Sequence, residues 1–92
     1  MTDAASGTFT VKNRLGLHAR AAAKLTQVAA RFPCEVRVGN ADQAVNAKSV
    51  MGLLLLCGAK GTDLSVEATG ERAEEAVRAI GELIDARFGE ED

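Results

Sequence analysis

The stretch DLSVEA at residues 63–68 alternates polar and apolar side chains, which is the two-residue period of a β-strand with one buried face. After a short turn, the stretch AEEAVRAIGELI at residues 73–84 places apolar side chains three and four residues apart, as in an amphipathic helix. Glu74 and Glu75 lie in its first turn and Arg87 near its end, where the helix dipole favours each charge. This pairing predicts a sheet with helices on one face.

The same two periods continue toward the N-terminus. The predicted order is strand 8–11, helix 19–30, strand 34–38, strand 43–47, helix 49–57, strand 63–68 and helix 73–84. Pro33 limits the first helix, and Ser49 and Gly58 are typical residues for the start and the end of the second. The uncovered face of the sheet is expected to present Thr8, Thr10, Glu35, Arg37, Ser65 and Glu67 to water.

The length of 92 residues predicts one α+β domain spanning 1–92, with frayed tails at 1–6 and 89–92. Apolar residues make up 47% of the chain but aromatics only 3%, so the core must consist mainly of Ala, Val, Leu and Ile. The formal net charge of -2 argues against nucleic-acid binding, which needs a basic face. We expect a monomer.

The chain has no sequence pattern that predicts a targeting segment or a metal site. Residues 1–7 lack the basic and apolar regions of a signal peptide, and the longest apolar run, 53–57, is too short to enter a membrane as a span. These features predict a cytoplasmic protein. Cys34 and Cys57 lack metal-ligand spacing, so free buried thiols are expected, with a disulfide as the alternative. No metal or cofactor is predicted, since one His and two distant Cys form no ligand set.

The single histidine of the chain, His18, lies in the stretch GLHAR at residues 16–20, at the start of a predicted helix. The first turn of a helix has unpaired N–H groups and the positive end of the dipole, which together bind anions. Neutral imidazole is a nucleophile near pH 7. Arg20 is able to contact a phosphoryl group on that ring. The pattern indicates a phosphate site, although a histidine at a helix start is more often a cap or a surface residue.

GLHAR at 16–20, together with KSVMGL at 48–53, resembles the HPr family, the histidine-containing phosphocarriers of the phosphoenolpyruvate-dependent sugar phosphotransferase system. The resemblance covers nearly the whole chain. It implies an open-faced β-sandwich with a four-stranded antiparallel sheet of order 1-4-2-3 and three helices. It also implies that enzyme I phosphorylates His18 on Nδ1, that Arg20 lies beside the phosphate, and that an enzyme IIA domain receives the group.

The chain departs from many family members at Ala21, where they have proline. Proline in a first helical turn removes an N–H that has no partner inside the helix. Alanine is therefore expected to keep the helix and to leave one more amide free near the phosphate.

The predicted helix at 49–57 is more apolar than burial requires, because it has apolar side chains on both sides. A helix sunk in the core is one interpretation. In a domain this small an exposed patch that suits several partners is the better one. With the family resemblance, the expected partner-binding residues are Val50, Met51, Leu54, Leu55, Ala23 and Gln27.

Ser49 corresponds to the position of a regulatory serine in many family members, which an HPr serine kinase/phosphorylase modifies. Serine is also an ordinary N-cap, and this role alone explains it. The leading hypothesis is a phosphoryl carrier with no turnover of its own. The alternatives are a regulatory carrier with the same chemistry and an interaction module that binds partners through the 50–55 apolar patch.

Overall fold

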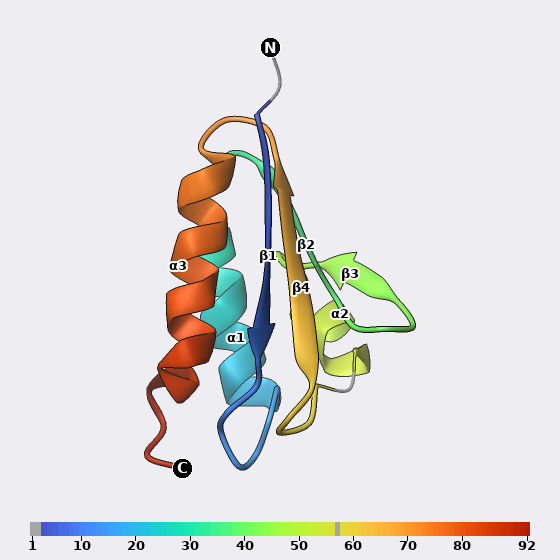
Figure 1. The fold of residues 1–92 in the computed structure, drawn as a ribbon, viewed down its shortest axis with the longest axis vertical. Coiled ribbons are helices and arrows are strands. Elements are labelled where there is room, and N and C mark those ends of the chain that lie inside the picture. The colour runs from blue at the N-terminus through green and yellow to red at the C-terminus, as the bar shows by residue number, and fades with distance from the viewer. Residues whose placement is uncertain (1–2, 57) are drawn as a thin grey trace.

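The computed structural model describes residues 3–56 and 58–92 as strands and helices in the order β-α-β-β-α-β-α, followed by a short 3-10 helix (Figure 1). The elements are β1 (Ala4–Thr10), α1 (Ala19–Ala29), β2 (Glu35–Gly39), β3 (Ala44–Asn46), α2 (Val50–Leu55), β4 (Asp63–Thr69), α3 (Ala73–Asp85) and η1 (Arg87–Gly89). Each strand and helix expected from the sequence is present. Cys57, at the predicted end of the second helix, lies outside the described residues.

The four strands form one antiparallel sheet of order β1-β4-β2-β3, as the family resemblance implied. β4 lies in the interior of the sheet, between β1 and β2, and its apolar side chains, Leu64, Val66 and Ala68, are all buried. β1 pairs with β4 along its full length, from Ala4 opposite Thr69 to Thr10 opposite Asp63.

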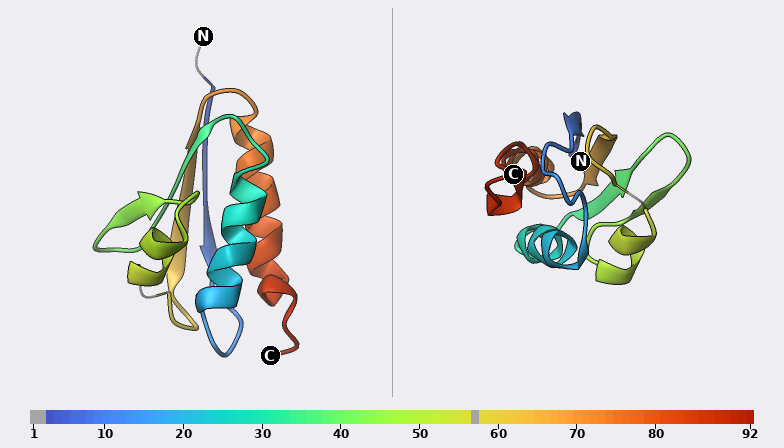
Figure 2. Two further views of the ribbon diagram at one scale, coloured as in Figure 1. Left: turned by 180° about the vertical axis from the view of Figure 1, so that it is seen from behind. Right: turned by 90° about the horizontal axis from the view of Figure 1, so that it is seen from below.

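Helices α1 and α3 lie side by side over one face of the sheet, and the other face is open (Figure 2). The core lies between these layers and consists chiefly of aliphatic residues, as the composition predicted. Its largest fully buried apolar side chains are Phe88, Leu25, Leu53, Leu56, Leu64, Ile80, Ile84, Val11, Val36, Val38 and Val66. On the open face the polar residues predicted to meet water are exposed, except that Ser65 is half-buried.

Helix α2 buries one side and exposes the other. Leu53 and Leu56 are fully buried, whereas Met51 and Leu55 are 69% and 67% exposed. The interpretation of a helix sunk in the core is therefore wrong. Val50, expected to face outward, is half-buried and packs against the core.

The two tails predicted to be frayed are ordered where the structure describes them. Ala4, Ala5 and Ser6 belong to β1, because pairing with β4 supplies backbone hydrogen bonds that a short alternating pattern could not reveal. At the other end Phe88 is fully buried. Arg87 and Phe88 have φ of 58° and 54°, a left-handed conformation that turns the chain back toward α1. The prediction of a frayed N-terminal tail is therefore wrong for residues 4–6.

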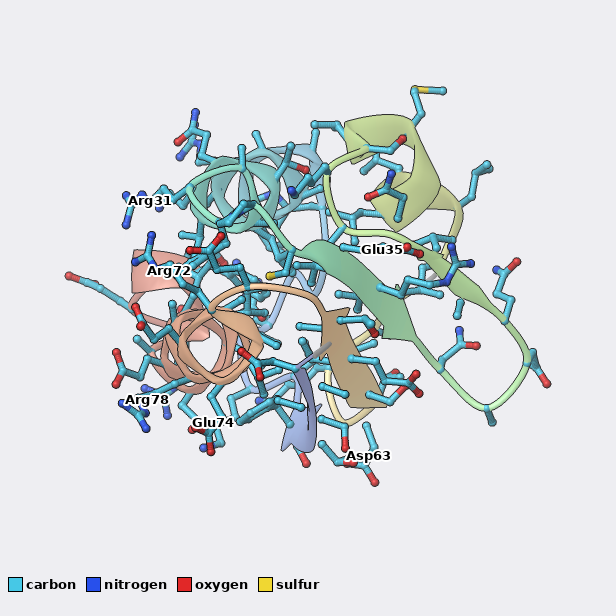
Figure 3. All side chains as sticks on the ribbon, turned by 90° about the horizontal axis from the view of Figure 1, so that it is seen from above. Arg31, Glu35, Asp63, Arg72, Glu74 and Arg78 are labelled. Atoms are coloured by element: carbon cyan, nitrogen blue, oxygen red, sulfur yellow. The ribbon has the colours of Figure 1, made fainter. Side chains whose placement is uncertain are left out.

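The end of the molecule opposite the start of α1 is polar. Figure 3 views this end and shows Arg31 and Arg72 beside the helix layer, with Glu74 and Arg78 nearby on α3. Arg72 lies 4.8 Å above the ring centroid of Phe32. Cys34, also at this end, is a free and buried thiol, as expected. Within the described part of the chain, no helix has the length and apolar character needed to span a membrane.

Candidate functional site

His18 is the N-cap residue of α1. Its backbone is extended, with φ of -78° and ψ of 179°, and Ala22 donates the first helical hydrogen bond to its carbonyl oxygen at 2.8 Å. The Arg20 N–H donates to Nδ1 of the imidazole at 3.2 Å. The ring therefore occupies the place that a Ser or Asp oxygen takes in an ordinary helix cap. Nδ1 consequently lies at the amides of the first turn.

The loop before His18 requires glycine at position 16. Gly16 has φ of 67°, and a Cβ placed on it would lie 2.4 Å from the carbonyl oxygen of Gly58. The next residue, Leu17, donates its N–H to that same oxygen at 2.8 Å and is itself buried. The segment that follows α2 therefore fixes the backbone next to the histidine.

A carboxylate from the C-terminal segment contacts the other side of the imidazole. Nε2 of His18 is in hydrogen-bond contact with Oε2 of Glu90. The fully buried Asn13 donates from Nδ2 to Oε1 of Glu90 at 2.9 Å and to the Gly16 carbonyl at 2.8 Å. The hydrogen bond from Asn13, followed by the one from His18, lowers the pKa of Glu90 below its usual value. Glu90 is therefore an anion at neutral pH.

Two further hydrogen bonds hold this segment against the start of α1. Lys24 donates from Nζ to the Phe88 carbonyl at 2.6 Å, and the Arg14 N–H donates to the Asp92 carbonyl at 2.8 Å. The result is a groove around the imidazole, lined by Arg14, Leu15, His18, Ala19, Arg20, Glu90, Glu91 and Asp92. The His18 side chain is 27% exposed, so one edge of the ring is open to a partner.

The predicted site residues fall into two groups. His18 and Arg20 lie together in the groove, and Arg20 is exposed. Ser49 is the N-cap of α2, and its Oγ accepts from the Gly52 N–H at 3.1 Å. Ser49 does not line this groove.

The predicted partner-binding residues lie on the two helices next to the groove. α2 lies beside α1, as the right-hand view of Figure 2 shows. On α1, Gln27 is exposed and Ala23 half-buried; on α2, Met51, Leu54 and Leu55 are exposed. Leu15, in the loop before His18, is 62% exposed and was not predicted to belong to this surface.

Sequence reasoning also missed Asn13 and Glu90. Asn13 lies in a loop and carries no motif, and Glu90 lies in an acidic run that is typical of a solvated tail. Their role depends on the burial of Phe88, which no local pattern indicates. In the part of the chain that the structure describes, no group of three or more His, Cys, Asp or Glu residues is arranged to hold a metal ion.

Known proteins match this chain in sequence and in fold. The family profile described as "PTS HPr component phosphorylation site" matches residues 5–86. The phosphocarrier protein HPr of Pseudomonas aeruginosa is 51% identical over 83 residues, covering 89% of this chain and 92% of that protein. HPr of Neisseria meningitidis serogroup A is 51% identical over 78 residues, covering 85% and 88%. The crystal structure of HPr-C-His from Thermoanaerobacter tengcongensis superposes with a TM-score of 0.91 at 40% identity, covering 96% and 99% of the two chains.

Proposed function

Because this chain belongs to the HPr family of phosphocarrier proteins of the phosphotransferase system, we propose that it accepts a phosphoryl group on Nδ1 of His18 and passes it on. The donor is phosphorylated enzyme I and the acceptor is an enzyme IIA domain. The observation that carries this proposal is the N-cap position of His18, which puts a nucleophilic nitrogen at the anion-binding end of α1.

The chemistry at the ring follows from the hydrogen bonds. The Nδ1 lone pair attacks the phosphorus of the donor phosphohistidine, a new N–P bond forms, and the donor's own N–P bond breaks. The Arg20 N–H, which donates to Nδ1 in the free protein, becomes available to a phosphoryl oxygen. The guanidinium of Arg20, exposed beside the ring, adds a second charge-assisted contact.

The partner surface is the apolar face next to His18. Met51, Leu54 and Leu55 form an exposed patch on α2, and a flexible methionine suits a surface that meets more than one partner. Leu15 is a further exposed apolar residue, at the groove itself. We assign Ala23, Gln27 and Val50 to its edges. Enzyme I and the enzyme IIA domain would use the same surface in turn, because each must reach Nδ1.

We assign a regulatory role to Ser49. A phosphate there would lie at the start of α2, where the first-turn amides stabilise negative charge. It would also lie next to the patch that a donor must cover. The kinase that would modify it is the HPr serine kinase/phosphorylase of this family.

The carrier is not an enzyme by itself in this proposal, acts as a cytoplasmic monomer and works through its partner enzymes. A regulatory carrier would use the same site. The other alternative, an interaction module that binds through the α2 patch, would never be phosphorylated on His18. The described site favours the carriers, because it keeps His18 and Arg20 together in an open groove.

The test is intact-protein mass spectrometry after incubation with phosphoenolpyruvate and enzyme I. We expect one phosphate, acid-labile and alkali-stable, which is absent from His18→Ala. A second incubation with ATP and the serine kinase reports on Ser49, with Ser49→Ala as its control. Phosphate on His18→Ala under the first conditions would contradict the central assignment. An unmodified wild type in the presence of active enzyme I would favour the interaction module.

A further inference from the structure

The imidazole of His18 has a partner on each of its two nitrogens. The Arg20 N–H points at Nδ1, and the Glu90 carboxylate contacts Nε2. A backbone N–H is always a donor, so Nδ1 must be the unprotonated nitrogen. The ring proton therefore lies on Nε2, where it is donated to Glu90. Both contacts select the same tautomer, and it is the one in which Nδ1 has a free lone pair.

The position of Glu90 is determined by contacts outside the ring. Asn13, which is fully buried, donates to the second carboxylate oxygen of Glu90. Phe88, two residues earlier, is buried in the core, and Lys24 holds its carbonyl oxygen. Arg87 and Phe88 are both in the left-handed region, which costs free energy for residues other than glycine. The packing of Phe88 thus offsets a strained turn that brings one carboxylate to the histidine.

On the basis of the proposed function, we propose that Glu90 is a positioning residue that holds the Nε2–H tautomer of His18 and neutralises the ring charge created by phosphorylation. When Nδ1 forms its bond to phosphorus, the ring keeps its Nε2 proton and becomes a phosphoimidazolium with one positive charge. The electron pair of the broken N–P bond returns to the donor nitrogen. The carboxylate of Glu90, already on Nε2, neutralises the new charge without moving.

Glu90 belongs to residues 89–92, a segment whose sequence predicts a frayed tail. A carboxylate that orients a histidine through its far nitrogen acts in the same way as the aspartate of a hydrolytic triad. The competing interpretation is that Glu90 is a shield, which repels an incoming phosphoryl group and must move away first. The two interpretations predict rate changes of opposite sign when Glu90 is replaced.

The experiment compares E90Q and E90A with E82Q, which removes one exposed acidic charge from α3 and leaves Asn13 and His18 untouched. Nitrogen-15 NMR of the uniformly labelled, unphosphorylated proteins reports which ring nitrogen bears the proton and whether the Nε2–H signal is protected from exchange. Rapid-quench kinetics with phosphoenolpyruvate-charged enzyme I report the rate of phosphorylation. Thermal melts establish that the variants are folded.

We expect a protected Nε2–H signal in the wild type and in E82Q, a less protected one in E90Q, whose single amide oxygen cannot accept from both His18 and Asn13, and its loss in E90A. The phosphorylation rate should fall on the order of tenfold in E90A, by less in E90Q, and not in E82Q. A wild type without a protected Nε2–H, or an E90A rate at or above that of the wild type, would overturn the proposal. Failure of the proposed function looks different, because the wild type itself then takes up no phosphate.

Discussion

Helices α1 and α3 lie side by side in one layer, yet they begin in opposite ways. α3 follows Arg72, which has φ of 65° and provides no side-chain cap, and its first turn contains Glu74 and Glu75. α1 follows His18, which caps the helix with a neutral ring nitrogen, and its first turn contains no acidic residue. α3 thus neutralises its dipole with its own carboxylates, whereas α1 has none in its first turn and meets carboxylates only from the C-terminal segment that lines the groove.

The two starts also differ in how local strain is balanced. At α3 the strained Arg72 stacks over Phe32, and its Nε and Nη2 donate to Glu75 at 3.1 and 2.9 Å. All of these contacts lie at one end of the molecule. Near the start of α1 the strained residues are Arg87 and Phe88, which follow α3. Their turn places the Glu90 carboxylate against His18. The first arrangement stabilises the fold, and the second prepares a site.

The largest effect is expected from Gly16→Ala, which alters the loop that delivers His18 to the start of α1. The new Cβ would meet the Gly58 oxygen and sit at positive φ, so we expect a loss of about 2–4 kcal/mol in the free energy of unfolding. Gly61→Ala is the control: Gly61 has φ of 90° with nothing within 4 Å, so only about 1–2 kcal/mol should be lost. Equal losses in urea titrations would show that the Gly58 contact does not demand glycine.

Ala19→Glu should make the start of α1 resemble that of α3. Ala19 is the first residue of α1, is exposed and lines the groove. A carboxylate there should stabilise the helix by about 0.3–1 kcal/mol and raise the barrier to phosphorylation by roughly 2–3 kcal/mol through repulsion. Ala30→Glu, at the exposed C-cap, should destabilise the helix slightly and leave the rate unchanged. Equal rates in both variants would show that charge at the start of α1 does not control acceptance.

Arg20→Ala tests whether the first turn of α1 serves the ligand more than the fold. Arg20 is exposed, so stability should change by less than about 0.5 kcal/mol. Loss of a charge-assisted phosphate contact should cost about 1.5–3 kcal/mol in the transfer barrier, measured by rapid quench with enzyme I. Arg31→Ala, exposed at the other end of α1, is the matched control and should transfer normally. Normal kinetics in Arg20→Ala would remove Arg20 from the site.

Much of the fold and part of the candidate site could be predicted from the sequence. What could not be predicted has a physical cause. The alternation in β4 and the apolar stripe of α3 predicted the layers, because those patterns follow directly from one-sided burial. His18 was identified because a helix start and an imidazole each have their own chemistry. Glu90 could not be identified, because its position depends on Phe88 packing into the core from a left-handed turn. That packing is a tertiary property with no periodic signal.

Ser49→Asp extends the comparison to the start of α2. Aspartate is a good N-cap, so the melting temperature should be preserved or raised. The added charge beside the apolar patch should raise the barrier to phosphorylation by enzyme I by about 0.5–1 kcal/mol. The increase should be larger at low salt. Ser49→Asn is a cap without the charge and should transfer at the wild-type rate. If Ser49→Asp also transfers at that rate at every ionic strength, Ser49 is better explained as a plain helix cap.

The smallest effect is expected from Glu75→Gln, which removes a carboxylate from the start of α3. The side chains of Glu75 and Arg72 are 56% and 46% exposed, so their ion pair is a surface pair of small net value. Its loss and the loss of the favourable dipole interaction should together lower stability by about 0.3–0.8 kcal/mol. Glu74→Gln loses the dipole interaction without that ion pair and should cost less. Urea titrations at low and high salt compare the stability losses of the two variants. Salt screens both contributions, so the difference between the two losses should shrink at high salt.

Neither variant should change the phosphorylation rate, since the charges that these residues neutralise belong to α3. A slower rate in either would mean that the acidic start of α3 also acts on the site at α1, and the division between a stabilising and a reactive helix start would then be wrong.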